Sequence, residues 1–209
     1  MYLFTRSGRF APGATRDVVT YVGEVTEKVR QETGLSVDAW SSTFSPDLGT
    51  VVWAVFAEDL ATLEQANDKL AVSDSFIDLV DRGAQLFAGP VSDSLAQVVA
   101  GEIDPAAPTP QYVSVARAVA ANGQLRAAFA AGVEIAQAAT QITGVPGLFV
   151  VDATGPYGGC AWTSGFADIG ALQQAEAALN ADEGWLELID RVGPAYQQGA
   201  TQAIYRHAG

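Results

Sequence analysis

The hydrophobic positions of this 209-residue chain form short β-type runs and longer helical runs, and the same order of runs occurs twice. Apolar residues recur at helical spacing in each half, at Val18, Val22, Val25 and Val29 and at Leu125, Phe129, Val133 and Ala136. Each run stops at a glycine, Gly34 or Gly144, where the C-cap of a helix is expected. The pattern therefore predicts one long amphipathic helix in each half.

Strands and a second helical region are predicted around each of these helices. The β-rich runs are YLFTRSGRF, SVDAWSSTF, TVVWAVFA and SLAQVVA in the first half, and YVSVARAV, GLFVVDAT, GCAWTSGFA and TQAIYRH in the second. Asp59 and Asp168 are the expected N-caps of the second helical region, which breaks at SDS or DEG. The order in each half is β-α-β-β-α-β, which is the ferredoxin-like motif.

The two halves are also similar residue by residue, which indicates a duplication. With an offset of 109 residues, Trp53–Ala84 matches the second half at nine of 32 positions, including Trp53/Trp162 and Asp81-Arg82/Asp190-Arg191. With an offset of 110, residues 2–34 match the second half at eight of 33 positions. We expect repeat 1 at residues 1–101, a stiff proline-rich linker, EIDPAAPTP, at residues 102–110, and repeat 2 at residues 111–209.

The strand VVWAVFA, residues 51–57, carries no polar side chain on either alternation, and GLFVV in the second half is similar. Because a strand with one solvated face should alternate, both faces of each sheet are expected to be covered. Helices would cover one face, and the open faces of the two repeats would pack together. The predicted fold class is α+β: two ferredoxin-like repeats packed sheet to sheet as a pseudo-dimeric α+β barrel.

This arrangement resembles a known superfamily. A duplicated unit in which an apolar strand with Trp53 or Trp162 precedes a helix that runs into AVSDSFIDLV or NADEGWLELI is similar to the dimeric α+β barrel superfamily. It is most similar to the antibiotic-biosynthesis-monooxygenase and NIPSNAP-like branches. The resemblance covers almost the whole chain, through loose hydrophobic patterns and no catalytic signature. It implies a barrel dimer fused into one chain, and an activity among cofactor-independent oxygenases, isomerases, haem enzymes and proteins with no known activity.

Composition narrows the partners and the compartment. With 24 acidic and 11 basic residues the net charge is −13, which disfavours nucleic acid and anionic lipid as partners. The single cysteine, Cys160, excludes an internal disulfide and disfavours a Cys-based zinc site. The sequence also lacks the pair of histidines that a His-based metal site requires. No apolar run is long enough to span a membrane. We expect a cytoplasmic protein with neither cofactor nor metal.

Titratable residues that occur in one half only are the candidates for chemistry, because the shared scaffold does not require them. His207, the only histidine, is a candidate general base on the last strand, where Tyr205 shares its face. Its place beside the chain end favours a structural interpretation. Asp152 interrupts GLFVVDAT among apolar neighbours, so a raised pKa and a role as proton acceptor are expected. It could equally pair with Arg117 or mark the strand end.

Three further residues complete the candidate site. Tyr205, Trp162 and Cys160 are the predicted substrate-binding residues, although Trp162 and Cys160 fit a core role equally well. The first functional hypothesis is a small-molecule-binding protein, or a cofactor-independent oxygenase or isomerase. It would hold an apolar or aromatic molecule in a pocket of repeat 2, between the sheet and its own helices, with Asp152 or His207 as the base. The alternative is a non-catalytic scaffold or interaction protein that forms homo-oligomers through its outer helices.

Overall fold

The computed structural model describes residues 1–104 and 106–208 of the chain. Pro105 of the predicted linker and Gly209, the last residue of predicted repeat 2, lie outside the described residues. The chain divides into two units. Unit 1 contains Met1–Leu95 and the chain end from His207, and unit 2 contains Ala96–Arg206. Unit 2 thus begins before the predicted linker, and the repeat boundaries in the sequence stay a prediction.

The elements follow the predicted order twice. Unit 1 contains β1 (Tyr2–Arg9), α1 (Thr15–Thr33), β2 (Asp38–Thr43), β3 (Thr50–Ala57), α2 (Leu60–Ala71), α3 (Asp74–Gly83), the 3-10 helix η1 (Ala84–Leu86) and the start of β4 (Ser92–Ala100). Unit 2 contains the rest of β4, then β5 (Tyr112–Val119), α4 (Leu125–Thr143), β6 (Gly147–Asp152), β7 (Gly159–Phe166), α5 (Ile169–Ala181), α6 (Glu183–Val192), the 3-10 helix η2 (Gly193–Ala195) and β8 (Thr201–His207) except its last residue.

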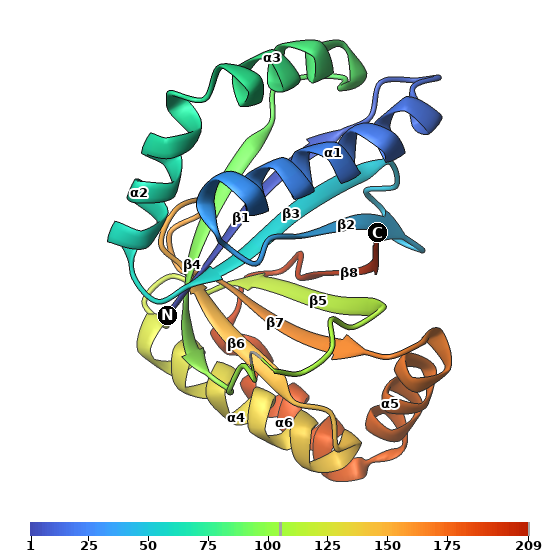
Figure 1. The fold of residues 1–209 in the computed structure, drawn as a ribbon. Helices are drawn as coiled ribbons and strands as arrows, with labels where there is room; N and C mark the ends of the chain where they lie inside the picture. Colours follow the sequence, from blue (N-terminus) through green and yellow to red (C-terminus); the bar gives the residue numbers. More distant parts are fainter. Residues whose placement is uncertain (105, 209) are drawn as a thin grey trace. The chain divides into compact units, whose positions relative to one another are not determined.

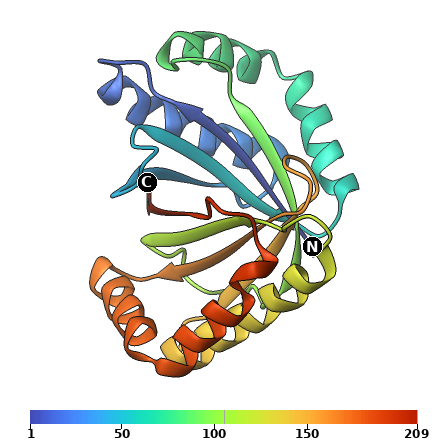
Figure 2. The same cartoon turned by 180° about the vertical axis from the view of Figure 1, so that it is seen from behind.

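In unit 1 the antiparallel strands lie in the order β1-β3-β2. The helices α1, α2 and α3 lie on one side of this sheet (Figures 1 and 2). Alternate residues of β3, Val51, Trp53 and Val55, point to that side and pack against Val18 and Val22 of α1. The helical stripe of valines that the sequence predicts is therefore the buried face of α1.

In unit 2 the antiparallel strands lie in the order β8-β5-β7-β6-β4. The helices α4, α5 and α6 again lie on one side of the sheet (Figure 1). Phe149 of β6 is completely buried against α4, and the close approach requires Gly132, where a Cβ would lie 2.1 Å from the Phe149 ring. We call this side the helix face of the sheet and the other side its open face.

The helix ends confirm the predicted capping residues. Gly34 and Gly144 both have positive φ, 77° and 70°, and both donate their amide to the preceding helix. Asp59 and Asp168 accept hydrogen bonds from the amides of Thr62 and Ala171 at the beginning of α2 and α5.

Equivalent tryptophans anchor the sheet to the long helix in both units. Trp162 donates its indole N–H to the carbonyl of Gly132 at 2.8 Å. Trp53 donates to the hydroxyl of Thr26 at 3.2 Å, and this hydroxyl donates to the carbonyl of Val22 at 2.7 Å. Val22 is the counterpart of Gly132 at an offset of 110 residues. The same helix carbonyl is thus satisfied in both units, directly in one and through a hydroxyl in the other.

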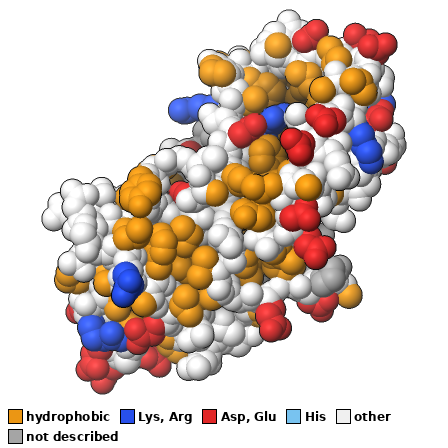
Figure 3. All heavy atoms as spheres, turned by 90° about the vertical axis from the view of Figure 1, so that its left-hand side faces the viewer, with side chains coloured by type: hydrophobic (Ala, Val, Ile, Leu, Met, Phe, Trp, Pro, Cys, Tyr) orange, Lys and Arg blue, Asp and Glu red, His pale blue; other side chains and the backbone are white. Residues whose placement is uncertain are grey.

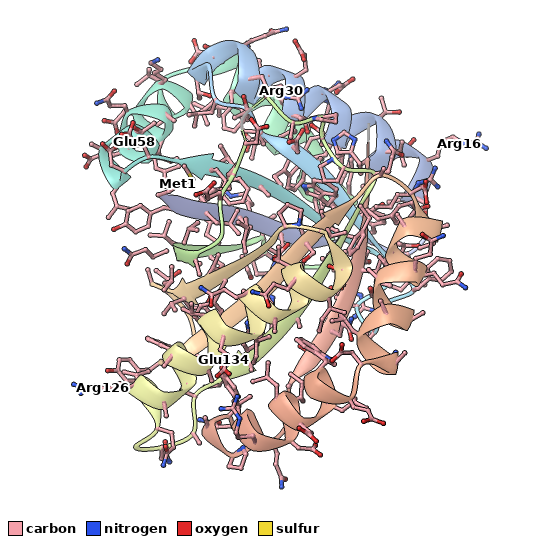
Figure 4. All side chains as sticks on the ribbon, turned by 90° about the horizontal axis from the view of Figure 1, so that it is seen from below. Met1, Arg16, Arg30, Glu58, Arg126 and Glu134 are labelled. Carbon is pink, nitrogen blue, oxygen red and sulfur yellow. The ribbon has the colours of Figure 1, made fainter. Side chains whose placement is uncertain are left out.

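An ion pair between helices also occurs in both units. Arg82 of α3 contacts Glu24 of α1 at 2.5 Å, and Arg191 of α6 contacts Glu134 of α4 at 2.5 Å. All four residues belong to the sequence positions that are identical between the halves. Glu134 is marked on α4 in Figure 4. Because both pairs are exposed, each contributes about 0–1 kcal/mol, and they mainly mark the shared ancestry of the units.

Candidate active site

The open face of the unit 2 sheet carries one of the predicted site residues, Asp152 at the end of β6. Residues paired across antiparallel strands point to the same face. Asp152 pairs with Ala96 of β4, while Val150, two residues earlier, pairs with Ala161 of β7. Ala96, Val150 and Ala161 are all buried and form an apolar cluster. The carboxyl group of Asp152 therefore lies beside a buried apolar cluster.

One oxygen of the Asp152 carboxyl lacks a hydrogen-bond partner among the described residues. Its Oδ1 atom is buried and accepts no hydrogen bond from any residue that the structure describes. Burial raises the pKa of Asp152, and the charge of Arg117 only partly opposes this effect. An unpaired buried carboxylate oxygen is costly, so the environment favours the neutral acid and favours any ligand that supplies a hydrogen-bond donor. A group with these properties can accept a proton from a bound molecule.

The equivalent position in repeat 1 carries a different residue with different hydrogen bonds. The strand registers align Asp152 with Ser42 and Gly159 with Thr50. The hydroxyl of Ser42 donates to the carbonyl of Asp47 at 2.9 Å and accepts from the amide of Thr50 at 3.1 Å, so it is satisfied within the hairpin. In unit 2, Gly159 leaves the space that the Asp152 carboxyl occupies, because a Cβ there would lie 2.2 Å from Oδ2. The scaffold therefore does not require a carboxylate at this point.

Two of the predicted substrate-binding residues, Cys160 and Trp162, lie on the helix face instead. Cys160 packs with Phe149 and Ala136 and is 1% exposed. Burial, followed by the charge of Asp152, raises the pKa of the Cys160 thiol to about 12, so it stays protonated at neutral pH. Trp162 packs against the rings of Phe149 and Tyr196, with centroids 5.3 and 5.5 Å away. The sheet separates both side chains from Asp152.

Tyr205 lies on the open face, as Asp152 does. It pairs with Val113 of β5. Val113 and Arg117 are an even number of positions apart, so their side chains point to the same face of that strand. The structure therefore brings Tyr205, Arg117 and Asp152 to one face of unit 2 and leaves Cys160 and Trp162 on the other. The sequence could not decide this, because the side on which Trp162 points depends on the register across the β6–β7 hairpin.

The fifth predicted residue, His207, belongs to unit 1 and has a different set of neighbours. Its Nε2 atom lies 3.4 Å from Asp38 Oδ1 at the start of β2, and its ring meets Trp40 edge-on at 5.1 Å. The next residue, Ala208, donates its amide to the carbonyl of Ala39 at 2.9 Å. His207 is therefore held at the edge of β2 and does not share a unit with Asp152.

Sequence reasoning missed the residues around His207. Arg30 of α1, marked in Figure 4, donates from Nη2 to Asp38 at 2.8 Å and from Nε to the carbonyl of Val37 at 2.8 Å. In the repeat alignment Asp38 corresponds to Leu148 and Arg30 to Thr140, so the two charged residues occur in one half only. The criterion that selected His207 and Asp152 would have selected them also. Because Asp38 binds Arg30 more closely than His207, the cluster is foremost an anchor for the strand and the chain end.

A surface groove of about 410 Å³ lies in unit 2 between α4 and the end of α6. Its floor consists of small residues, including Ala127, Ala130 and Ala131, and the Glu134–Arg191 ion pair lies at its side. This groove lies between helices, whereas the pocket predicted from the sequence lies between the sheet and its helices. The described residues contain no cluster of three or more metal-ligating side chains, and no described helix is both long and apolar enough to cross a membrane.

Comparison with known proteins gives structural neighbours only. No protein-family model and no curated protein matches the chain. Among solved structures, a "Putative monooxygenase" from Fusobacterium nucleatum subsp. nucleatum ATCC 25586 superposes with a TM-score of 0.75 at 9% identity, over 100% of this chain and 92% of that chain. A second one, from Lactobacillus acidophilus NCFM, has a TM-score of 0.66 at 8% identity, over 100% and 94%.

An "anthrone oxidase-like protein" superposes with a TM-score of 0.69 at 12% identity, over 99% of this chain and 90% of that chain. Identities this low establish the fold and leave the activity open. The resemblance seen in the sequence is confirmed at this level: the chain has the fold of the dimeric α+β barrel superfamily, shared with monooxygenase-like proteins.

Proposed function

We propose that the protein is an acid–base enzyme for a small apolar or aromatic molecule, of the cofactor-independent oxygenase or isomerase type. Asp152 is the proton acceptor. The observation that carries the proposal is the buried Oδ1 atom of Asp152, which has no hydrogen-bond partner among the described residues. The fold shared with monooxygenase-like and anthrone oxidase-like proteins supports it.

The chemistry follows from the environment of the carboxyl. Asp152 Oδ1 takes a proton from a C–H or O–H group of the substrate, and the electron pair of the broken bond stays on the substrate. In an isomerase the proton returns at another carbon. In an oxygenase the resulting carbanion reacts with molecular oxygen. Both routes begin with the same step, which is why a raised pKa at Asp152 is useful.

Proton abstraction can be measured without knowledge of the later steps. We would incubate the protein in D₂O with a panel of anthrones, aromatic ketones and phenols, and follow deuterium uptake and oxygen consumption. Asp152→Asn should lower exchange by about 100-fold or more, the usual contribution of a general base. Asp68→Asn is the matched control, because Asp68 is an exposed carboxylate of α2 in the other unit. Equal exchange by both variants would refute the role of Asp152.

The pocket of repeat 2 belongs to the same proposal. The contacts of Phe149, Trp162 and Tyr196 occupy the helix face, so we place the substrate at Asp152, where β6 ends. Ala96, Val150 and Ala161 beside it are buried. Val150→Lys should therefore prevent folding, whereas an exposed position would tolerate a lysine within about 0.5 kcal/mol.

The alternative function, a scaffold that oligomerises through its outer helices, is favoured by exposed apolar residues. Val19, Val72, Ile77 and Val80 of unit 1 are 61%, 80%, 40% and 40% exposed. Figure 3 shows hydrophobic side chains exposed among acidic ones on the surface of the molecule. Light scattering tests this function, because a scaffold requires oligomers whose population falls in Val80→Glu. A monomer at high protein concentration would contradict it.

A further inference from the structure

The groove between α4 and the end of α6 is lined by side chains that are smaller than their counterparts in unit 1. Four of the lining residues are alanines in the repeat alignment: Ala127, Ala130, Ala131 and Ala195 replace Asp17, Thr20, Tyr21 and Leu86. Each replacement removes side-chain atoms from the wall of the groove. The side chains that open the groove are therefore particular to repeat 2.

In unit 1 an aromatic ring lies between the two equivalent helices. Tyr21 of α1 is 8% exposed, and its ring lies over Gly83 at the end of α3, where an added Cβ would lie 2.1 Å from Tyr21 Cζ. The counterparts in unit 2 are Ala131 and Val192, so a methyl and an isopropyl group stand where unit 1 has the ring. The place that holds a tyrosine ring in one repeat is thus left partly open in the other.

A tyrosine is exposed beside this groove. Tyr157, at the tip of the β6–β7 hairpin, is 89% exposed. The turn depends on Gly158, which has a φ of 80°, and does not require the ring. Ala120 donates its amide to the carbonyl of Gly158 at 2.9 Å, and Ala121 donates to the carbonyl of Ala195, in the wall of the groove, at 2.8 Å. The exposed ring and the groove therefore lie at the same end of unit 2.

We infer that the protein forms a homodimer in which Tyr157 of each copy inserts its ring into the groove of the other copy. The groove volume of about 410 Å³ accommodates such a ring, and unit 1 holds a tyrosine ring at the equivalent place. Because the tip and the groove lie at one end of unit 2, a two-fold axis can bring both contacts together at once. A buried tyrosine ring is among the strongest contributors to binding at interfaces. The dimer does not depend on acid–base chemistry at Asp152.

Sedimentation equilibrium at protein concentrations from about 5 to about 500 µM tests the dimer. The unchanged protein should associate with a Kd of roughly 10–500 µM, because a small interface gives weak association. Tyr157→Ser should raise this Kd by at least about 10-fold, whereas Tyr157→Phe, which keeps the ring, should stay within about 3-fold. Leu48→Ser is the matched control, because Leu48 is the exposed counterpart of Tyr157 in the unit 1 hairpin, and it should leave the Kd unchanged.

The groove is tested by filling it without adding charge. Ala127→Gln with Ala130→Gln changes two exposed positions of α4, and glutamine favours the helix, so folding should be retained and is checked by circular dichroism. The Kd of this double variant should rise by at least about 10-fold.

A monomer over the whole concentration range would overturn the inference. So would a dimer that persists in either Tyr157→Ser or the double variant, because the ring and the groove are both required. Val80→Glu alters unit 1 and should leave this dimer intact. Association that is lost in Val80→Glu and kept in Tyr157→Ser would assign the contact to the helices of unit 1 instead.

Discussion

Asp152 and Gly159 fit each other across β6 and β7: a Cβ at Gly159 would lie 2.2 Å from Asp152 Oδ2 and 3.0 Å from its Cγ. No side chain other than that of glycine leaves this carboxyl in place. Gly159 does not have a positive φ, so the requirement comes from space and not from backbone conformation. The pair is absent from repeat 1, where Ser42 and Thr50 occupy the equivalent positions.

Gly159→Ala should therefore destabilise the protein by about 1–3 kcal/mol, because the added methyl group overlaps the carboxyl. Chemical denaturation measures the loss. The double variant Gly159→Ala with Asp152→Ala should recover most of it, giving a large coupling energy between the two sites. Gly23→Ala is the control. Gly23 is in α1, where no atom lies within 4 Å of an added Cβ, so this substitution should stabilise the protein by about 0.5–1 kcal/mol. Additive effects of Gly159→Ala and Asp152→Ala would contradict the contact.

Asp152→Asn should change stability in a pH-dependent direction. Because burial raises the pKa of Asp152 in the folded state, the folded protein holds this proton more tightly than the unfolded chain. Stability from this group is fully present below the unfolded pKa and is lost as pH rises through the folded pKa. Unfolding from about pH 3 to about pH 8 should thus show Asp152→Asn gaining stability relative to the unchanged protein as the pH rises. A gain that shrinks with rising pH would be the wrong sign.

Thr26 tests the bridge between Trp53 and α1. Thr26→Val keeps the shape but removes the hydroxyl, so the buried indole N–H loses its acceptor and the Val22 carbonyl loses a donor. We expect a loss of about 1–3 kcal/mol in the free energy of unfolding. Thr20→Val, at an exposed position of the same helix, should change it by less than about 0.5 kcal/mol. Similar effects of both variants would show that the bridge contributes nothing.

The cluster around His207 should behave as an anchor in which Arg30 is the stronger partner of Asp38. Arg30 lies 2.8 Å from Asp38 Oδ1, whereas His207 lies 3.4 Å from it. Double-mutant cycles at neutral pH should give a coupling of about 0.5–1 kcal/mol between Arg30 and Asp38 and a smaller one between His207 and Asp38. A larger coupling for His207 would reverse the assignment and favour His207 as a catalytic base oriented by Asp38.

The sequence predicted the parts of the fold that depend on neighbouring residues. The caps at Gly34 and Asp59 follow from local geometry, and the duplication made each prediction testable in the other half. Register is not local, so Trp162 could not be assigned to the helix face in advance. The neighbours of His207 depend on where the chain end meets β2, a contact between residues 169 positions apart. No single-sequence pattern encodes such a contact.

In the candidate site, too, some features follow from the local sequence and others depend on the order of the strands. The apolar context of Asp152 could be read from GLFVVDAT, and the raised pKa follows from it. Whether Arg117 pairs with Asp152 depends on the strand between them. Because β7 separates β5 from β6, the two charges share a face without forming an ion pair.

The titration of the Asp152 carboxyl is the most direct test of this account. Carbon-13 NMR of protein labelled at aspartate would resolve it, and the signal missing from Asp152→Asn identifies it. The account predicts a midpoint above about 3.9, the ordinary value for aspartate, because the carboxyl is partly buried and its Oδ1 atom has no hydrogen-bond partner among the described residues. A midpoint at or below about 3.9 would mean that the carboxylate is stabilised in the folded protein, and would contradict its role as the proton acceptor.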